Sequence, residues 1–176
     1  VGILSFAVDS EGLSTPNPKH LIHSLKLLKL RQRRLSRRTT NSHRQQKARV
    51  LVAKAYENIA NQHNNFIHKL ANYYIGNYGN IYVENLDIGD MISHKRYALH
   101  IQDATWGRFF DLLSYKAEYA GRVLNRTAPQ NTSQLCSSCG EKVLKPLSQR
   151  IHSCPYCGIT LNRDHNAALN ILHNGD

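Results

Sequence analysis

Apolar positions form short continuous runs at a few places in the chain and follow a helical spacing over most of the rest. Residues 1–8 are apolar and β-branched and are followed by turn-forming residues, so we expect one or two short strands there. Residues 81–86 form another apolar run between turn residues, which favours a central, parallel strand. Residues 123–132 are expected to lead, partly as a strand, into the C-terminal segment.

Apolar residues between positions 20 and 74 recur at intervals of three and four, or multiples of them. This spacing predicts two antiparallel helices joined by a loop at residues 39–42. We interpret residues 87–97 as irregular and residues 98–120 as one helix that ends at Gly121. A last short helix is predicted over residues 164–172. Because helices alternate with short strands, the fold class is α/β with a mixed sheet.

The charge of the chain is concentrated in the predicted helical hairpin, residues 19–75. The formal net charge is +11, and residues 13–55 hold twelve Lys or Arg but no Asp or Glu. Either this surface contacts nucleic-acid phosphates, or it is a solvated helix face. We favour phosphate contacts, because no acidic residue offsets the repulsion between the Lys and Arg side chains. Such contacts would be salt-dependent and indifferent to base sequence. The candidate nucleic-acid-binding residues are Lys29, Arg31, Arg33, Arg34, Arg37, Arg38, Arg44, Lys47 and Arg49.

All four cysteines lie in two C-x-x-C pairs, Cys136 with Cys139 and Cys154 with Cys157, and a glycine follows each pair. Two such turns present four thiolates tetrahedrally, an arrangement that suits structural Zn²⁺. Disulfides and buried free thiols are the alternatives. We see no signal peptide and no apolar run of membrane-spanning length, so we favour zinc in a reducing compartment.

Two carboxylates lie where their charge calls for an explanation. Glu84 falls within the apolar run 81–86, and Asp164 begins the last predicted helix beside the second cysteine pair. Carboxylates that meet at the ends of strands and helices hold Mg²⁺ or Mn²⁺, which catalyse phosphodiester cleavage. Alternatively, Glu84 is a solvated strand end and Asp164 is a helix N-cap. The residues alone leave both interpretations open.

Several phrases, taken in order, resemble the C-terminal half of the TnpB (OrfB) family of insertion-sequence proteins, relatives of the type V CRISPR effectors. They cover nearly the whole chain and are FAVDSEG, NPKHL, LRQRRLSRR, ENIANQHNNFIHKLA, IYVENLDI, TWGRFFDLLSYKAEYAGR, TSQLCSSCG and CPYCGITLNRDHNAALNIL. The resemblance implies a RuvC-like domain of the RNase H-like fold, residues 1–131 and 159–176, with a zinc ribbon, residues 132–158, inserted in it.

The family's activity is RNA-guided cleavage of DNA, and three acidic residues hold its catalytic Mg²⁺ or Mn²⁺. Glu84 matches the second acid and Asp164 the third, while the four cysteines match the ribbon ligands. The family's first strand reads like VGID followed by glycine; here Leu4 stands at the Asp position, and Asp9 lies beyond the strand. The resemblance therefore predicts an impaired metal-dependent endonuclease.

Two other interpretations stay open: a non-catalytic nucleic-acid-binding module derived from a transposase, and an incomplete record of an active enzyme. The expected partners are DNA and, in the full-length family, a guide RNA. The expected location is the prokaryotic cytoplasm, in association with the nucleoid.

Overall fold

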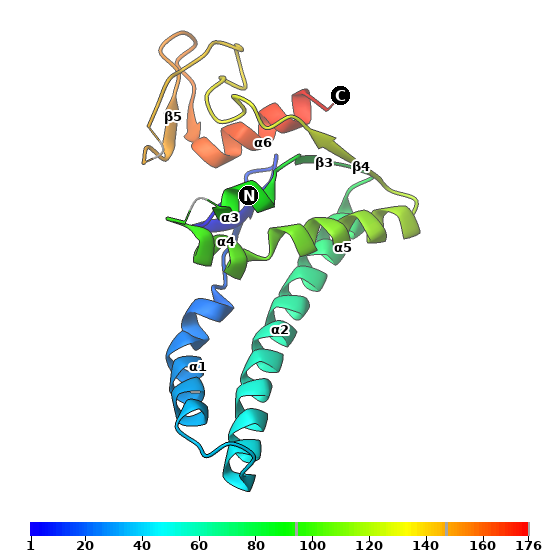
Figure 1. The fold of residues 1–176 in the computed structure, drawn as a ribbon. Helices are drawn as coiled ribbons and strands as arrows, with labels where there is room; N and C mark the ends of the chain where they lie inside the picture. The colour runs from blue at the N-terminus through cyan, green and yellow to red at the C-terminus, as the bar shows by residue number, and fades with distance from the viewer. Residues whose placement is uncertain (94, 147, 176) are drawn as a thin grey trace.

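A long helical hairpin projects from an α/β body in the computed structural model, which describes residues 1–93, 95–146 and 148–175 (Figure 1). Helices α1 (His20–Ser36) and α2 (His43–Asn77) form the hairpin, as predicted. The Ser42 side chain caps α2 by accepting a hydrogen bond from the Gln45 amide. Leu28 of α1 packs against Ala55 and Ile59 of α2 in a small core of its own.

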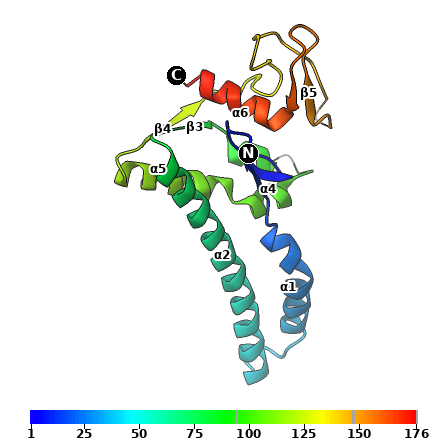
Figure 2. The ribbon, with the colours of Figure 1, turned by 180° about the vertical axis from the view of Figure 1, so that it is seen from behind.

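Three further helices lie at the base of the hairpin, one of them across the upper end of α2, and they correct two sequence predictions (Figure 2). The segment expected to be irregular contains α3 (Ile88–Ser93). The single helix expected over residues 98–120 is two helices, α4 (Ala98–Ala104) and α5 (Trp106–Tyr119). They meet at Thr105, whose φ of 56° lies in the left-handed region and turns the chain between them. Gly121, with a φ of 63°, follows α5 as expected.

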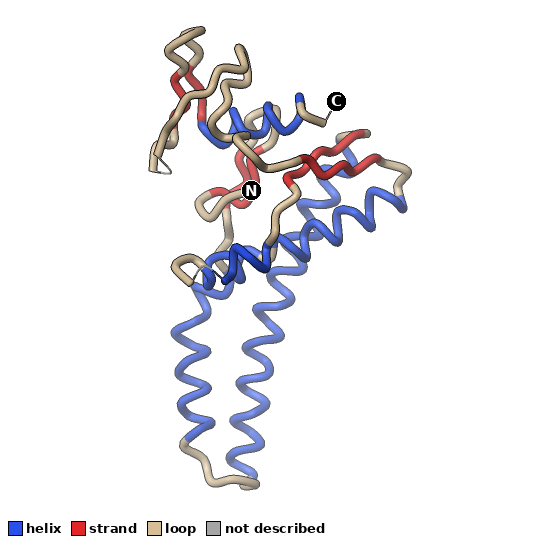
Figure 3. The backbone as a smooth tube through the Cα atoms, turned by 45° about the horizontal axis from the view of Figure 1, so that its top comes forward, coloured by secondary structure: helices blue, strands red, loops and turns tan. Residues whose placement is uncertain are grey.

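The strands form three separate pairs within the described part of the chain, drawn red in Figure 3, and not the one mixed sheet expected from the sequence. The antiparallel pair β1 (Ser5–Val8) and β2 (Ser14–Pro16) is near the N-terminus. The parallel pair β3 (Asn80–Glu84) and β4 (Val123–Thr127) follows α2 and α5. The antiparallel pair β5 (Ile151–Ser153) and β6 (Thr160–Asn162) belongs to the ribbon.

The predicted strand at 81–86 is therefore parallel, as expected, but it is not central. Strands β1 and β3 line the same cavity without pairing with each other, so the two sheets stay separate. The physical reason is the conformation of residues 1–4, which bend at this point and supply no strand to bridge the two edges.

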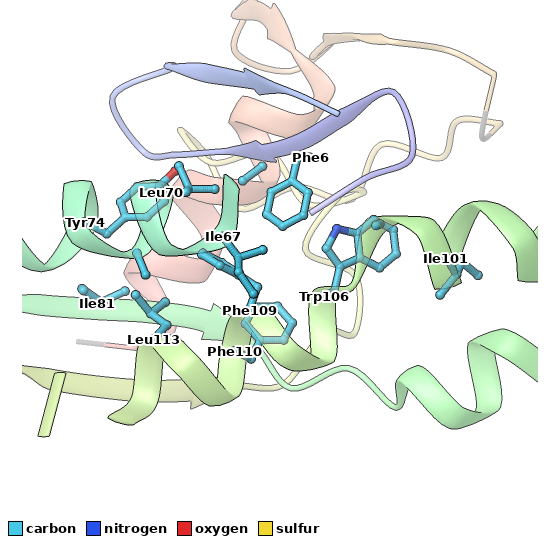
Figure 4. Packing of buried hydrophobic residues seen from close by; sticks show 13 residues of the cluster. Phe6, Ile67, Leu70, Tyr74, Ile81, Ile101, Trp106, Phe109, Phe110 and Leu113 are labelled. Atoms are coloured by element: carbon cyan, nitrogen blue, oxygen red, sulfur yellow. The ribbon is translucent and has the colours of Figure 1, made fainter. Parts of the chain in front are cut away.

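The main core joins α2 and α5 with the first strand pair (Figure 4). Phe6 of β1 is fully buried and packs edge to face with Phe66 and Phe109, with ring centroids 4.8 and 5.3 Å apart. Trp106 and Leu113 of α5 are almost completely buried in the same cluster. Burial of such aromatic groups fixes β1 on the two helices.

Helix α6 (Arg163–His173) lies beyond the strands, on the side away from α5 (Figure 1). It contacts β1, β3 and the β5–β6 pair. The elements are thus layered, with α2 and α5 below the strands and α6 and the ribbon above. None of the described helices is both long and apolar enough to cross a membrane.

Candidate functional site

The four cysteines of the two C-x-x-C pairs come together in one cluster. Their sulfur atoms all lie within 4.8 Å of one another, and no pair forms a disulfide. Sγ atoms of Cys136 and Cys157 are 3.7 Å apart, and those of Cys139 and Cys154 are 3.6 Å apart. Four sulfurs around Zn²⁺ at about 2.3 Å form a tetrahedron with edges of about 3.8 Å. The donor set and its spacing therefore fit a closed, structural zinc site.

The two cysteine turns have the same backbone design. Gly140 donates its amide to the carbonyl of Cys136, and Gly158 donates to that of Cys154. Both glycines have φ values near +77°, which a residue with a Cβ adopts only under strain. The two glycine-containing turns therefore have the shape expected of metal-binding turns, and zinc binding by them stays a prediction.

Close packing of the four thiols gives Cys139 and Cys154 different pKa values. The backbone hydrogen bond at Glu141 favours the Cys139 thiolate, yet burial and hydrogen bonds with the other three sulfurs raise the pKa of Cys139 to about 12. Burial disfavours the Cys154 thiolate, but the amides of Cys157 and Tyr156 and the neighbouring thiols lower the pKa of Cys154 to about 7. Four thiols thus share a space that suits thiolates bound to one cation.

Two asparagines that the sequence reasoning missed attach the ribbon to α6. Asn166 is fully buried; its Oδ1 accepts from the Ser137 amide at 3.0 Å and its Nδ2 donates to the Leu135 carbonyl at 2.7 Å. Asn170 donates to the carbonyls of Thr132 and Leu135. Their spacing of four, among the apolar residues 167–172 of the helix, was the available signal, because asparagine in a helix interior needs a compensating bond.

Glu84 lies at the end of β3, where three distant segments meet. Its Oε1 accepts a hydrogen bond from Thr132 Oγ1, at the start of the ribbon, at 3.0 Å. Its Oε2 is 3.8 Å from the α-amino group of Val1. The side chain is mostly buried, so it is not a solvated strand end.

Asp164 lies in the first turn of α6, and it is not the helix N-cap. Asn162 caps the helix, because its side chain accepts hydrogen bonds from the amides of Asp164 and His165. The Asp164 carboxylate is partly exposed and lies 3.8 Å from Arg150 Nη1. Its position four residues before Ala168, which lines the cavity beside β3, puts it on the α6 face that points toward the strands.

Glu84 and Asp164 do not by themselves form a divalent-metal site. Of the described residues, only the four cysteines gather as a group of three or more metal-ligand side chains. Asp9 accepts hydrogen bonds from the amides of Glu11 and Leu13, so it holds the turn after β1. The catalytic role of the two carboxylates stays a prediction.

The nine candidate phosphate-binding residues all lie on or beside the far half of the hairpin, away from the body. Between α1 and α2 runs a groove of about 570 Å³ with a mixed apolar and basic lining. Arg31 donates a hydrogen bond to the Leu51 carbonyl across the hairpin at 2.8 Å, so it also has a structural role. The exposed basic residues of the groove are Arg34, Arg38, Arg44 and Lys47.

Comparison with known families matches both halves of the chain. The OrfB_IS605 model, described as a probable transposase, matches residues 1–95, more than half of the chain. The chain belongs to the OrfB_IS605 family. A second model, the Cas12f1-like TNB domain, matches residues 106–171, which include all four cysteines.

Relatives of this OrfB_IS605 chain are longer proteins. A Streptomyces pristinaespiralis protein, provisionally named an RNA-guided DNA endonuclease, is 34% identical over 99% of this chain and 44% of its own length. The CRISPR-associated endodeoxyribonuclease Cas12f1 of Sulfoacidibacillus thermotolerans is 29% identical over 92% of this chain and 39% of its own length. The chain therefore spans less than half the length of these relatives.

The fold is also that of a solved structure. The Cas12f1 protein in a cryo-EM structure of a Cas12f1–sgRNA–target DNA complex matches 90% of this chain with a TM-score of 0.61 and 23% identity, and the match covers 43% of that protein. At 23% sequence identity, this match shows that the two proteins share a fold.

Proposed function

We propose that this chain forms the RuvC-like and zinc-ribbon part of a transposon-encoded, RNA-guided DNA endonuclease. Residues 1–131 and 159–176 are the RNase H-like domain in this proposal, and residues 132–158 are the ribbon, which holds Zn²⁺. Membership in the OrfB_IS605 family and the names of the relatives support this function. Such a protein acts on DNA with a guide RNA, in the nucleoid of a prokaryotic cell.

One observation carries the proposal for the catalytic face: Glu84 is the point at which the chain start, β3 and the ribbon meet. Leu4, aligned above with the family's first acid, is 59% exposed. In this proposal Leu4 stands at the position of the first carboxylate of a three-acid site, and Glu84 and Asp164 are the other two acids.

The carboxylates of the described residues alone do not fit a catalytic Mg²⁺ or Mn²⁺ site, so we derive no cleavage step for them. Hydrocarbon at Leu4 offers a metal no oxygen ligand. The chain by itself is proposed to bind nucleic acid through the hairpin and to cut poorly. A non-catalytic binding module, the second candidate function, is favoured by this same incomplete set of carboxylates.

A nuclease assay separates the two candidates. Labelled single-stranded DNA is incubated with Mn²⁺ and either the unmodified chain or the variant Leu4→Asp. Matched controls are Leu4→Asn and Leu4→Asp combined with Glu84→Gln. We expect cleavage only by Leu4→Asp with intact Glu84, because only that protein has all three carboxylates of the family's set.

Two outcomes would contradict the proposal. Glu84-dependent cleavage by the unmodified chain would show that the site is complete without a further acid. If the Leu4→Asp variant bound DNA and zinc but did not cut, the binding-module function would be favoured.

The zinc proposal is tested separately by metal analysis. We expect about one Zn²⁺ per chain, because one tetrahedral site takes four thiolates. Cys136→Ser should lose most of the metal and Ser138→Ala should keep it. Substantially less than one zinc in the unmodified chain, with all four thiols reduced, would refute the assignment.

A further inference from the structure

The groove between α1 and α2 has an apolar half and a basic half. The half nearer the body is lined by Leu27, Leu30, Ala48 and Leu51. The half nearer the loop that joins the helices is lined by Arg34, Arg38, Arg44 and Lys47. The four residues from Leu30 to Arg34 advance the helix by about 6 Å. Apolar and basic side chains are therefore close enough to contact one ligand together.

The leucines of the apolar half are open to solvent although they lie between two packed helices. Leu27, Leu30 and Leu51 are 48%, 43% and 49% exposed. The core of the hairpin lies elsewhere, where Leu28 is buried against α2. Arg31 donates its hydrogen bond to the Leu51 carbonyl beside these leucines and ties the two helices together. The groove is thus a preformed site with an open apolar surface.

The charge of the groove selects a polyanion. All of its lining residues fall within residues 13–55, which hold no Asp or Glu. Guanidinium and ammonium groups donate to phosphate oxygens, so the basic half fits a phosphodiester backbone. A duplex would contact only this half, because its bases are paired and stacked inside. A single strand also has free base faces, and packing them on the leucines removes apolar surface from water.

An acidic amphipathic helix would also carry both negative charge and an apolar face. Such a helix docks through apolar anchors that recur along several of its turns, so it needs a continuous apolar groove. Here the leucines occupy only the half nearer the body, and every lining side chain of the other half is a cation. The division into two halves therefore favours a strand with its backbone in one half and its bases in the other.

The lining also favours DNA over RNA. Its described residues are Leu, Ala, Arg and Lys, so none of them has a hydroxyl, amide or carboxylate side chain. The 2′-hydroxyl of RNA is both a donor and an acceptor of hydrogen bonds. In this groove its proton would have no side-chain acceptor, whereas deoxyribose has no such group to satisfy.

We propose that the groove binds single-stranded DNA, with phosphates on the basic half and unstacked bases on Leu27, Leu30 and Leu51. Its volume of about 570 Å³ falls in the range of pockets that hold small organic ligands, so base-sized groups fit. The inference rests on the proposed binding of nucleic acid through the hairpin. It adds that the hairpin distinguishes a single strand from a duplex, and that leucines make the distinction.

Fluorescence anisotropy on the full chain tests the choice of ligand. The probe is a labelled oligodeoxyuridylate strand, which is compared with an abasic strand of the same length and with oligouridylate. We expect the oligodeoxyuridylate to bind about tenfold more tightly than the abasic strand, because only the former has bases to pack on the leucines. Oligouridylate, which differs only by its 2′-hydroxyls, should bind more weakly than oligodeoxyuridylate.

A double variant, Leu30→Gln with Leu51→Gln, tests the leucines themselves. Glutamine keeps a good helix propensity but removes the apolar surface. The variant should bind oligodeoxyuridylate about tenfold more weakly, and it should bind the abasic strand and a duplex with oligodeoxyadenylate as before. Its slope of log K against log salt should not change, because no phosphate contact is lost. Circular dichroism checks that both helices are kept.

Val50→Gln is the matched control for the double variant. Val50 is 52% exposed on α2, like the leucines, but it does not line the groove. This variant should bind every probe as the unmodified chain does. A loss of affinity equal to that of the double variant would overturn the role of the groove.

The outcomes separate this inference from the proposed function. Equal affinity for oligodeoxyuridylate and the abasic strand, or no effect of the double variant, would overturn the inference but leave phosphate binding intact. Failure of every nucleic-acid probe to bind would contradict nucleic-acid binding by the chain itself. Tighter binding of oligouridylate than of oligodeoxyuridylate would overturn the assignment to DNA. Leucine-dependent binding of the acidic peptide acetyl-ELLEELLEELLE-amide, with leucine-independent binding of DNA, would instead identify a protein helix as the occupant.

Discussion

The buried carboxylate of Asp103 links both helices of the hairpin to α4. Asp103 of α4 is 2% exposed, and it accepts hydrogen bonds from the amides of Leu21 and Ile22 at the start of α1 and pairs with His63 Nε2 of α2 at 2.9 Å. Burial favours the neutral acid, but the His63 hydrogen bond and the two amides outweigh it and hold the pKa of Asp103 below its ordinary value. Asp103 also complements the positive end of the α1 dipole.

Asp103→Asn tests this connection. We expect a loss of about 2 kcal/mol in the free energy of unfolding at pH 7, because the charged hydrogen bonds disappear. A carboxylate with a lowered pKa stabilises the fold above its unfolded pKa, and this contribution falls as the pH drops below about 4. Denaturant unfolding across that range should therefore show a flatter acid profile for the variant. The exposed Asp111→Asn is the control; identical profiles for all three proteins would refute the role.

Asn166 tests the attachment of the ribbon to α6. Asn166→Ala leaves the Ser137 amide and the Leu135 carbonyl without this partner, so we expect a loss of about 2 kcal/mol in unfolding free energy. Hydrogen exchange in residues 132–142 should speed up. His173→Ala, on the exposed end of the same helix, is the matched control. Unchanged exchange in the variant would mean that the metal alone holds the ribbon in place.

At the scale of elements, hydrophobic periodicity predicted one helix where the structure has two, α4 and α5. Apolar positions continue across residues 98–120 with helical spacing, no proline lies in this range, and Gly107 falls inside α5 and not at the break. Thr105 nevertheless adopts a φ of 56°, a strained conformation for a β-branched residue. Packing of Ile101 and Trp106 in the same core directs the two helices apart and offsets this strain.

Thr105→Gly should therefore raise the free energy of unfolding by about 1 kcal/mol, because glycine adopts a positive φ without a steric penalty. Thr105→Ala, which keeps a Cβ, should give a smaller gain or none. Thermal and denaturant unfolding measure both. If glycine were less stable than threonine, the left-handed conformation would not be a source of strain.

At the scale of the whole molecule, positive charge is separated from the predicted catalytic face. The basic residues of the hairpin lie at the end away from the body, whereas Glu84 and Asp164 lie among the strands and α6 (Figure 1). A nucleic acid bound along the hairpin would thus be held by phosphate contacts at a distance from those carboxylates.

Salt dependence of single-stranded DNA binding tests this arrangement. Replacing Arg34, Arg38 and Arg44 with Gln should weaken binding and lower the slope of log K against log salt by about 2, at about 0.7 per lost phosphate contact. A matched variant replaces the exposed Arg108, Arg122 and Lys142 of the body with Gln. Fluorescence anisotropy measures both, and equal slopes for the two variants would contradict binding along the hairpin.

The sequence by itself determined the features that depend on local spacing. The hairpin follows from apolar residues at intervals of three and four, and the cysteine cluster follows from two C-x-x-C turns with their glycines. These patterns act within a few residues of the chain, so no knowledge of the packing is needed to interpret them.

Only the tertiary structure decided the features that join distant segments. The split at Thr105, the separate sheets, the Asp103 connection and the asparagine bonds to the ribbon all depend on partners far away in the chain. Glu84 was named from its sequence context, but its contacts with Val1 and Thr132 appear only in the folded chain. The physical reason is that burial and hydrogen bonding are set by which elements pack together, whereas helical spacing and turn residues act locally.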